Sequence, residues 1–377
     1  MTHYGFLSTF PPTRCGLATF TESLSDALVL GGDEDGTVVR VVDQPEDRGR
    51  HDPGTRSRVR TELIADDRLS TMRATMALNA CDVAIVQHEY GIYGGPDGDQ
   101  VIEVLAALRI PAIVVLHTVL VAPTAHQREV LTEVCRLASK VVVMTAHARD
   151  NLAAHYAVDL ARVHIIPHGV RHVALRESEP HSSRRVVTWG LLSPGKGVEW
   201  GIRAMAQLTD DIPHVEYIVA GQTHPKVLAH AGESYRTMLS TLAGELGMEA
   251  SVRLDGHYLD PQQLGALIAS ADVVLLPYDS VDQATSGVLA EAVAAGIPVV
   301  ATGFPHAVEL LSSGAGTVVP HQDPDAIAHA LREILTGPSV ADRMREAALR
   351  ETNETTWSAV ADRYRALAAR LVAARAA

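Results

Sequence analysis

The feature that most constrains the fold is a repeated alternation of short apolar runs with helix-like segments. The runs are rich in Val and Ile, such as DVAIVQ at 82–87 and PAIVVLH at 111–117, and they lack the apolar–polar alternation of a strand with one wet face. Between them lie segments with helical spacing of apolar residues, such as ATFTESLSDALVL at 18–30. Because strands that alternate with helices form βαβ units, the sequence predicts a doubly wound α/β fold with parallel sheets.

The alternation occurs twice. It stops in the polar stretch RHVALRESEPHSSRR at 171–185 and then restarts with RVVTWG at 185–190. We therefore predict a Rossmann-like domain over 1–175, a second over 184–355, and a C-terminal helix over 356–377 that packs towards the first domain. Ligands of open α/β sheets bind beyond the carboxyl ends of the strands, so two such domains facing each other are expected to share a ligand across a cleft.

Composition narrows the class of protein. The 377 residues are 47% hydrophobic and 20% charged, which is typical of globular domains, and the formal net charge is −13. That charge argues against nucleic acid or an anionic membrane as the default partner. Seven arginines lie between Arg48 and Arg73, but acids are interleaved with them, and we interpret the stretch as a solvated loop and helix face. Membrane contact is expected to be peripheral at most.

The cysteines and the N-terminus indicate a compartment. Cys15, Cys81 and Cys135 are odd in number and widely spaced, which favours a reducing cytoplasm over a disulfide framework or a zinc site. The start MTHYGFLSTFPP has neither a basic region nor a long apolar run, so no signal peptide is expected. We predict a cytoplasmic protein and can assign no oligomeric state.

The segment WGLLSPGKGVEW at 189–200 resembles a phosphate-binding P-loop without being one. From Gly190 it reads G-x-x-x-x-G-K, but Gly197 stands where the P-loop has a magnesium-binding Ser or Thr. Pro194 also removes one backbone N–H from a loop that should donate several. A G-x-G-x-x-G fingerprint is absent, and we interpret the D-x-D at 33–35 as a turn. We therefore expect neither a nucleoside triphosphatase nor a dehydrogenase.

Lys196 itself fits an anion site of another kind. It follows an expected strand and precedes a helix that begins near Val198. A lysine and the positive end of a helix dipole would then meet at the carboxyl edge of the sheet. The alternative is an ordinary surface lysine in a βα turn.

A second candidate anion site lies in DQATSGVLAEAVAAGIPVVATG at 282–303. The small residues Ser286 and Gly287 are expected to open a helix that ends before Gly296, and the first amides of a helix have no intrahelical partner. Glu291 lies in this helix, where its carboxylate could accept hydrogen bonds from a ribose diol or could be a plain surface acid.

Candidates in the first half lie at strand ends. Gly16 follows the first strand and a Pro-rich turn, where the backbone of a glycine lets a ligand approach closely. The segment HEYG places His88, Glu89 and Tyr90 after one strand, and His117 follows another. A histidine at a strand end either contacts a substrate or is satisfied locally.

Taken in order, these segments resemble glycosyltransferase family 4, whose members are retaining sugar transferases of the GT-B fold. The resemblance is strongest from Trp189 to Pro320, where the spacing of KG and EAVAAGIPVV matches the family pattern. PPTRCGLATFT, QHEYGIYGG, GLLSPGKG and TSGVLAEA point to a mannosyltransferase-like subgroup. The resemblance implies a hexose donor, GDP-mannose in particular, bound to the second domain, and a glycan or other hydroxyl acceptor on the first.

Residue roles follow from that resemblance. It implies that Lys196 contacts the donor diphosphate, that Glu291 holds the ribose hydroxyls, that Gly16 approaches the diphosphate, and that His117 touches the donor hexose. It also assigns the amides of Ser286, Gly287, Val288 and Leu289 to phosphate and sugar, Glu309 to the donor, and Arg14, His88, Glu89 and Tyr90 to the acceptor side.

Two departures from the family pattern bear on mechanism. Gln283 stands where the family carries the first Glu of a Glu-x7-Glu pair, so a carboxylate is missing near the sugar ring. Leu191 replaces the Arg that usually accompanies the lysine, and Arg14 or Arg236 could supply the missing charge. Without a carboxylate at 283, a covalent glycosyl–enzyme route has less support.

The implied chemistry needs no metal, because a lysine and free helix amides can stabilise a departing diphosphate. We expect no cofactor beyond the nucleoside diphosphate sugar. The alternatives are a non-catalytic sugar-nucleotide-binding protein and an epimerase or phosphorylase of the same fold.

Overall fold

The computed structural model describes residues 2–29, 35–42, 48–49, 57–171 and 184–376. The chain divides into two compact units. The first consists of Met1–Gly169 with Thr355–Ala377, and the second is Val170–Glu354. The expected domains were 1–175 and 184–355, with a helix over 356–377 returning to the first. Part of the expected linker, 172–183, lies outside the described residues, as do Asp33 and Glu34 of the D-x-D.

The first unit contains a seven-stranded parallel sheet in the order β3-β2-β1-β4-β5-β6-β7. The central strands β4 and β5 are buried at every residue, which explains their unbroken apolar sequences. The strands are β1 (His3–Ser8), β2 (Asp35–Val42), β3 (Arg58–Ile64), β4 (Val83–His88), β5 (Ala112–Leu116), β6 (Lys140–Val143) and β7 (Val163–Ile165).

Strand β3 corrects the interpretation of the stretch from Arg48 to Arg73 as a solvated loop and helix face. Its sequence RVRTELI has exposed arginines at the first and third positions and no continuous apolar run, because β3 is the edge of the sheet. Glu62 is the register partner of Arg40 on β2 and forms an ion pair with its fully buried guanidinium. A polar pair therefore helps to join the edge strand to the sheet, and apolar patterning does not detect such a contact.

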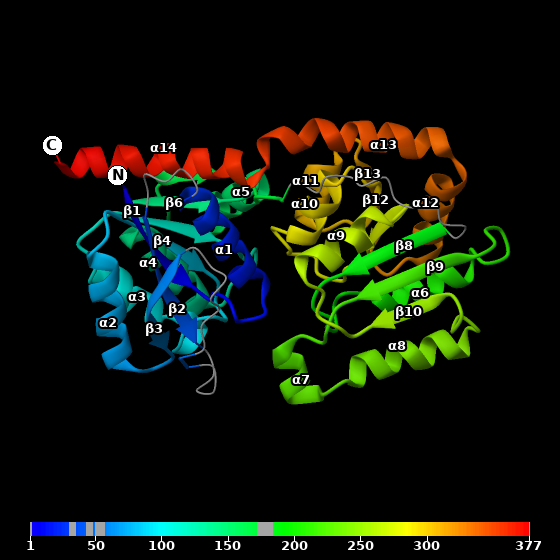
Figure 1. Cartoon of the computed structure of the whole chain (residues 1–377), viewed down its shortest axis with the longest axis horizontal. Coiled ribbons are helices and arrows are strands. Elements are labelled where there is room, and N and C mark those ends of the chain that lie inside the picture. Colours follow the sequence, from blue (N-terminus) through cyan, green and yellow to red (C-terminus); the bar gives the residue numbers. More distant parts are fainter. Residues whose placement is uncertain (1, 30–34, 43–47, 50–56, 172–183, 377) are drawn as a thin grey trace. The chain divides into compact units, whose positions relative to one another are not determined.

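Helices connect these strands and cover the sheet (Figure 1). The C-terminal helix packs against α1, and its Val360, Tyr364 and Leu367 belong to the same buried cluster as Phe6 of β1. The helices of the first unit are α1 (Gly16–Val29), α2 (Arg68–Asn79), α3 (Gln100–Ala106), α4 (Ala125–Leu137), α5 (Ala146–His155) and α14 (Trp357–Ala376), with single turns at Pro96–Gly98 and Leu160–Arg162.

The second unit repeats the design with six parallel strands in the order β10-β9-β8-β11-β12-β13. The strands are β8 (Arg184–Trp189), β9 (Val215–Ala220), β10 (Val252–Asp255), β11 (Val273–Leu276), β12 (Val299–Thr302) and β13 (Gly316–Val319). The helices are α6 (Val198–Ala206), α7 (Pro225–Ala231), α8 (Ser234–Glu245), α9 (Pro261–Ala269), α10 (Gly287–Ala294), α11 (Pro305–Leu311), α12 (Pro324–Thr336) and α13 (Pro338–Glu351), and the turn Thr352–Glu354 ends the unit.

Both sheets have the strand order of a Rossmann fold, with the order reversing between the first strand and the fourth of each unit. In the first unit these are β1 and β4, and in the second β8 and β11. The loops at the carboxyl ends of these strands are where open α/β sheets bind ligands. They contain Arg14, Glu89, Tyr90, Lys196, Gln283 and Ser286, whereas His117 follows β5 and Glu291 lies within α10.

Candidate functional site

The loop that carries Lys196 joins β8 to α6, and glycines shape it. Gly190, Gly195 and Gly197 all have positive φ. A Cβ on Gly197 would lie 1.8 Å from the carbonyl oxygen of Pro277, so no side chain fits there. The residue that a P-loop would use for magnesium is therefore a glycine for steric reasons. The helix begins at Val198, as expected.

The ammonium of Lys196 lies over the ring of Tyr278, 4.0 Å from its centroid. Tyr278 follows β11, is only 1% exposed and stacks on Phe304. Its hydroxyl has no hydrogen-bond partner among the residues that the structure describes. A cation over a buried, immobile ring is held in place while its N–H groups remain able to bind an anion.

Further contacts fasten the Lys196 loop to the segment after β11. The amide of Asp279 donates to the carbonyl of Gly195 at 3.0 Å, and the indole of Trp200 donates to the Asp279 carboxylate at 3.0 Å. Asp279 thus binds the loop that precedes α6 and also the first turn of that helix. The lysine is therefore preorganised by the Tyr278 ring under its ammonium and by the Asp279 contacts of its loop.

The start of α10 lies beside this loop. A Cβ on Gly190 would be 3.6 Å from Val288 in the first turn of α10. The amide of Ser286 donates to His306 Nδ1 at 2.8 Å, and the amide of Leu289 donates to the Ser286 hydroxyl at 3.2 Å. Of the four amides expected to bind phosphate, two are therefore engaged. Those of Gly287 and Val288 have no acceptor in the described part of the chain.

Glu291 is joined to the strand that precedes the Lys196 loop. The Trp189 indole donates to Glu291 Oε2 at 3.2 Å, and Oε1 has no partner among the described residues. Burial raises the pKa of Glu291, and the Trp189 hydrogen bond and the nearby Arg171 act in the opposite direction. The carboxylate is thus oriented by one oxygen and can accept hydrogen bonds at the other.

Gln283 and Glu309, which the family resemblance also assigns to the donor side, precede and follow β12 in the chain. The Gln283 amide donates to the carbonyl of Thr285 at 3.2 Å, which places it in the loop that leads into α10. Glu309 lies on α11 after β12 and is exposed.

Arg236 reaches the same edge of the second sheet. Its Nη2 donates to the carbonyl of Gly221 at 2.7 Å, and its Nε lies 3.2 Å from the Glu233 carboxylate. Gly221 directly abuts Gly190, because a Cβ there would lie 2.0 Å from the Gly190 oxygen. The buried Nη1 of Arg236 has no partner among the described residues. This guanidinium therefore stands beside the loop in which Leu191 replaces the usual arginine.

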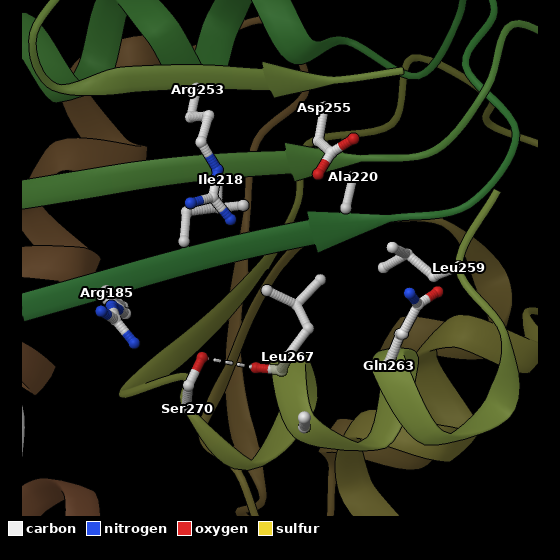
Figure 2. A pocket seen from close by; sticks show the side chains of 10 residues that line it. Arg185, Ile218, Ala220, Arg253, Asp255, Leu259, Gln263, Leu267 and Ser270 are labelled. Carbon is white, nitrogen blue, oxygen red and sulfur yellow. Dashed lines mark hydrogen bonds between the residues drawn. The ribbon is translucent and has the colours of Figure 1, made fainter. Parts of the chain in front are cut away.

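A cavity of about 320 Å³ lies between the β8–β10 side of this sheet and α9 (Figure 2). Ala220 lines it and is the register partner of Trp189, whose indole holds Glu291. Figure 2 shows Asp255 and Gln263 at the end where the strands stop. The ring and the amide of His257 both bind Asp255 Oδ1. The other carboxylate oxygen, Oδ2, has no partner in the described structure. The remaining lining residues are Arg185, Ile218, Arg253, Leu259, Ala266, Leu267 and Ser270.

His117, in the first unit, is a half-buried imidazole. Its Nε2 lies 2.7 Å from Oε1 of the buried Gln87, and its ring meets the ring of Phe20 edge-on. Burial, followed by the neighbouring His168 and His88, lowers the pKa of His117 to about 3. If Gln87 accepts the Nε2 proton, Nδ1 is the free acceptor. The residue is suited to accepting a hydrogen bond and not to carrying a positive charge.

His88 is fully buried, which changes the role that the sequence suggested. It ends β4, is 0% exposed, and neither ring nitrogen has a partner among the described residues. Its ring lies against Tyr90, 5.2 Å between centroids. In this conformation His88 cannot touch an acceptor and can act only by packing under residues that do.

We expect His88→Leu to make the protein less sensitive to acid. Burial lowers the pKa of His88 to about 4 from an ordinary 6.5. The unfolded chain takes up this proton below about pH 6.5 while the folded chain does not, so the free energy of unfolding falls as pH falls. Relative to wild type, the variant should gain about 2 kcal/mol between about pH 7.5 and about pH 5.

Urea unfolding is monitored by hydrogen exchange in peptides of the first unit. This measures the free energy of unfolding of that unit without interference from the second unit. The comparison between the two pH values is its own control, since any packing defect of Leu at 88 acts at both. A difference that does not change with pH would contradict the lowered pKa of His88.

The other candidates of the first unit lie around the same sheet edge. Glu89 accepts a hydrogen bond from the Thr118 hydroxyl and so joins the loops after β4 and β5. Tyr90 donates to the carbonyl of Gln127 at 3.4 Å. Gly16 begins α1, and a Cβ there would meet nothing described within 4 Å. Arg14 is exposed in the loop before it.

Sequence reasoning missed several residues that position the site. Tyr278 lies under Lys196, His306 holds the start of α10, and Gln87 binds His117. Each is buried and sits on a different element from its partner. A weak signal was available, since Tyr278 and His306 both follow strongly apolar strands, where side chains reach the carboxyl edge of the sheet.

Among the residues that the structure describes, no three His, Cys, Asp or Glu side chains are grouped so as to hold a metal ion. No described helix has both the length and the apolar character needed to span a membrane.

The two halves of the chain match two known families. Residues 16–172 match the family described as Glycosyltransferase Family 4, and residues 175–351 match the one described as Glycosyl transferases group 1. The chain carries two glycosyltransferase domains. Their matched ranges correspond to the two units, so the Lys196 and Glu291 site lies in the group 1 domain and His117 in the family 4 domain.

Similar proteins agree with these domains. The chain is 27% identical over 257 residues to the D-inositol 3-phosphate glycosyltransferase of Streptomyces avermitilis, covering 62% of this chain and 53% of that protein. It is 28% identical over 285 residues to the enzyme of that name from Corynebacterium glutamicum, covering 67% and 65%. The chain thus spans between about half and two thirds of the length of these curated relatives.

A solved structure shows the fold. The crystal structure of Anabaena HepE in complex with UDP and glucose superposes with a TM-score of 0.77, at 16% identity over 98% of this chain and 100% of that one. The predicted GT-B fold of the glycosyltransferase domains is therefore confirmed.

Proposed function

We propose that the chain is a retaining glycosyltransferase that moves a hexose from a nucleoside diphosphate sugar to a hydroxyl acceptor. One observation carries the proposal. In the group 1 domain, contacting segments bring together the Lys196 ammonium over the Tyr278 ring, the first two amides of α10, and the Glu291 carboxylate, which has one oxygen engaged by Trp189. This is the set of groups that a diphosphate and a ribose require.

The proposed chemistry follows from where charge develops. When the bond from the anomeric carbon to the diphosphate breaks, negative charge grows on the leaving phosphate. Lys196 and the amides of Gly287 and Val288 are positioned before the reaction, so they stabilise that charge without reorganising. Arg236, beside Gly190, supplies the second cation that Leu191 cannot. These groups suffice for a reaction without a metal cofactor.

The nucleoside is proposed to extend from Glu291 into the cavity of Figure 2. Glu291 Oε1 would accept the ribose hydroxyls, and the base would lie over Ala220 towards Asp255. The free Oδ2 of Asp255 is complementary to the N–H donors on the edge of guanine, which favours a GDP-sugar such as GDP-mannose. HepE is crystallised with UDP, so a UDP-sugar is the competing donor.

On the acceptor side we propose the loops after β4 and β5, with Glu89, Tyr90 and Arg14 near the acceptor. His117 would contribute as a neutral hydrogen-bond acceptor for a sugar hydroxyl, since its lowered pKa makes it a poor base. The acceptor would be a glycan or another hydroxyl compound. The two relatives are named for inositol 3-phosphate, a hydroxyl compound as well.

No covalent glycosyl–enzyme is proposed. Double displacement needs a carboxylate nucleophile close to the anomeric carbon, and the family position offers the amide Gln283 instead. Attack from the same face as the departing phosphate then accounts for retention.

The proposal is tested by binding and turnover together. We expect GDP to raise the melting temperature more than UDP, ADP or ATP, with or without magnesium, because stabilisation grows as RT ln(1 + [L]/Kd). A transfer assay with GDP-mannose and UDP-glucose in the presence of a mixed glycan acceptor should release the nucleoside diphosphate. Stabilisation by UDP alone, with turnover of the UDP-sugar, would refute the guanine assignment and leave the transferase standing.

The alternatives give other results. Nucleotide binding without turnover on any acceptor would indicate a sugar-nucleotide-binding protein. Turnover only with inorganic phosphate would indicate a phosphorylase, and conversion of the donor sugar without transfer would indicate an epimerase.

A further inference from the structure

Helix α2 exposes large apolar side chains, and neither the fold nor the proposed reaction requires this. Leu69, Met72 and Met76 are 54%, 62% and 72% exposed. They are spaced three and four residues apart, so they form one stripe along the helix. We refer to Leu69, Met72 and Met76 as the α2 face.

The opposite side of α2 is what packs on the sheet. Ser70, Thr71, Ala74 and Leu78 are the buried residues of this helix. Small and hydroxyl-bearing side chains thus face inwards while two methionines and a leucine face outwards, which reverses the usual pattern of a surface helix. Burial in this fold does not account for the exposed side.

Charge is distributed just as unevenly. Arg68 and Arg73 lie on either side of the α2 face, and α2 contains no acidic residue, although the chain as a whole has 45 acids against 32 lysines and arginines. Arg58 and Arg60 are exposed on β3, the strand on which α2 packs. None of these four guanidiniums has a carboxylate partner in the described residues.

Two acids directly precede α2 in the chain and lie at its N-terminal end. Asp67 is the N-cap and accepts from the amides of Leu69 and Ser70, and Asp66 lies in the turn before it. Both are at the N-terminal end, whereas Met72, Arg73 and Met76 continue away from them.

We propose that the α2 face docks on the surface of an anionic lipid bilayer. Leu69, Met72 and Met76 would enter the boundary between headgroups and acyl chains, and Arg68 and Arg73 would reach the lipid phosphates. Long arginine stems beside an apolar stripe suit this interface, because the stem stays in apolar surroundings while the guanidinium contacts phosphate. The charge complementarity favours an anionic bilayer over a protein partner or a second copy of the chain.

The contact would be peripheral, since no described helix can span a membrane. It does not depend on the proposed reaction, because binding to vesicles needs neither donor nor acceptor. If the transfer reaction proved wrong, this inference would be unaffected.

Sedimentation with vesicles tests the inference on the full chain. We expect binding to vesicles of phosphatidylcholine with about one third phosphatidylglycerol, and at least ~10-fold weaker binding to phosphatidylcholine alone. The triple variant Leu69→Ser/Met72→Ser/Met76→Ser and the double variant Arg68→Glu/Arg73→Glu should each lose at least ~10-fold in partitioning. All five side chains are exposed, so circular dichroism should show unchanged folding.

Matched variants elsewhere keep the test specific. Leu228→Ser/Met238→Ser/Leu349→Ser removes three comparably exposed apolar side chains from the other unit, and Arg343→Glu/Arg350→Glu reverses two arginines of α13. Both should bind vesicles as wild type does, apart from a small general effect of charge. Failure of the wild-type protein to bind anionic vesicles, or retained binding by the two α2 variants, would overturn the inference. A dimer in light scattering that only the α2 triple variant dissociates would assign the face to a second copy instead.

Discussion

Replacing Lys196 with Met should lower kcat/KM for the sugar nucleotide by about 100-fold. The substitution keeps the length of the side chain and removes the ammonium that lies 4.0 Å from the Tyr278 ring centroid. Because negative charge grows on the diphosphate as the bond breaks, the loss should be larger in kcat than in the affinity for the free nucleoside diphosphate. Steady-state kinetics together with calorimetric titration of GDP separates the two effects.

The control is Lys140→Met, at the start of β6 in the other unit. It removes one positive charge from a chain that has few lysines, so it measures the effect of net charge alone and should leave kcat/KM near wild type. Equal losses for both variants, or unchanged kinetics for Lys196→Met, would show that the diphosphate binds elsewhere.

Gly197→Ser should destabilise the second unit by at least ~3 kcal/mol and abolish activity. The substitution completes the P-loop sequence G-x-x-x-x-G-K-S, yet a Cβ at 197 would lie 1.8 Å from the Pro277 oxygen, and φ there is +62°. The loop must either distort or lose its contact with the segment after β11. Urea unfolding and transfer activity measure the two outcomes.

Gly195→Ser separates strain from clash, because φ at 195 is also positive, at +88°, but nothing described lies within 4 Å of a Cβ there. It should cost about 1–2 kcal/mol, the strain of a left-handed residue alone. A stable Gly197→Ser variant that hydrolyses ATP with magnesium would mean that the loop is a P-loop after all.

Much of the fold was predictable because it depends on local pattern. Most of the strands coincide with short, largely apolar runs, because both faces of a central parallel strand are buried. The start of α10 after Ser286 and its end before Gly296 followed from capping preferences. Strand β3 was not predicted because it is an edge strand whose arginines face solvent. Its Glu62 forms an ion pair with the buried Arg40 of β2, and apolar patterning does not detect such a contact.

The candidate site was predictable in its members and not in its contacts. Lys196, Glu291 and His117 were found because they follow strands or begin helices, where open α/β sheets expose side chains. Their partners Tyr278, Trp189 and Gln87 lie on or just after other strands, at separations of 82, 102 and 30 residues. No local pattern relates residues so far apart.

The sequence by itself therefore determined the α/β class, its repetition in two halves and the strand ends that carry the candidate residues, because helix and strand periodicity act over a few residues. Only the tertiary structure decided that position 197 has no room for a side chain, that two of the four amides at α10 are already bound, and that His88 is buried. Each of these depends on packing between strands that are adjacent in the sheet and distant in the chain, and close packing leaves no record in the order of the residues.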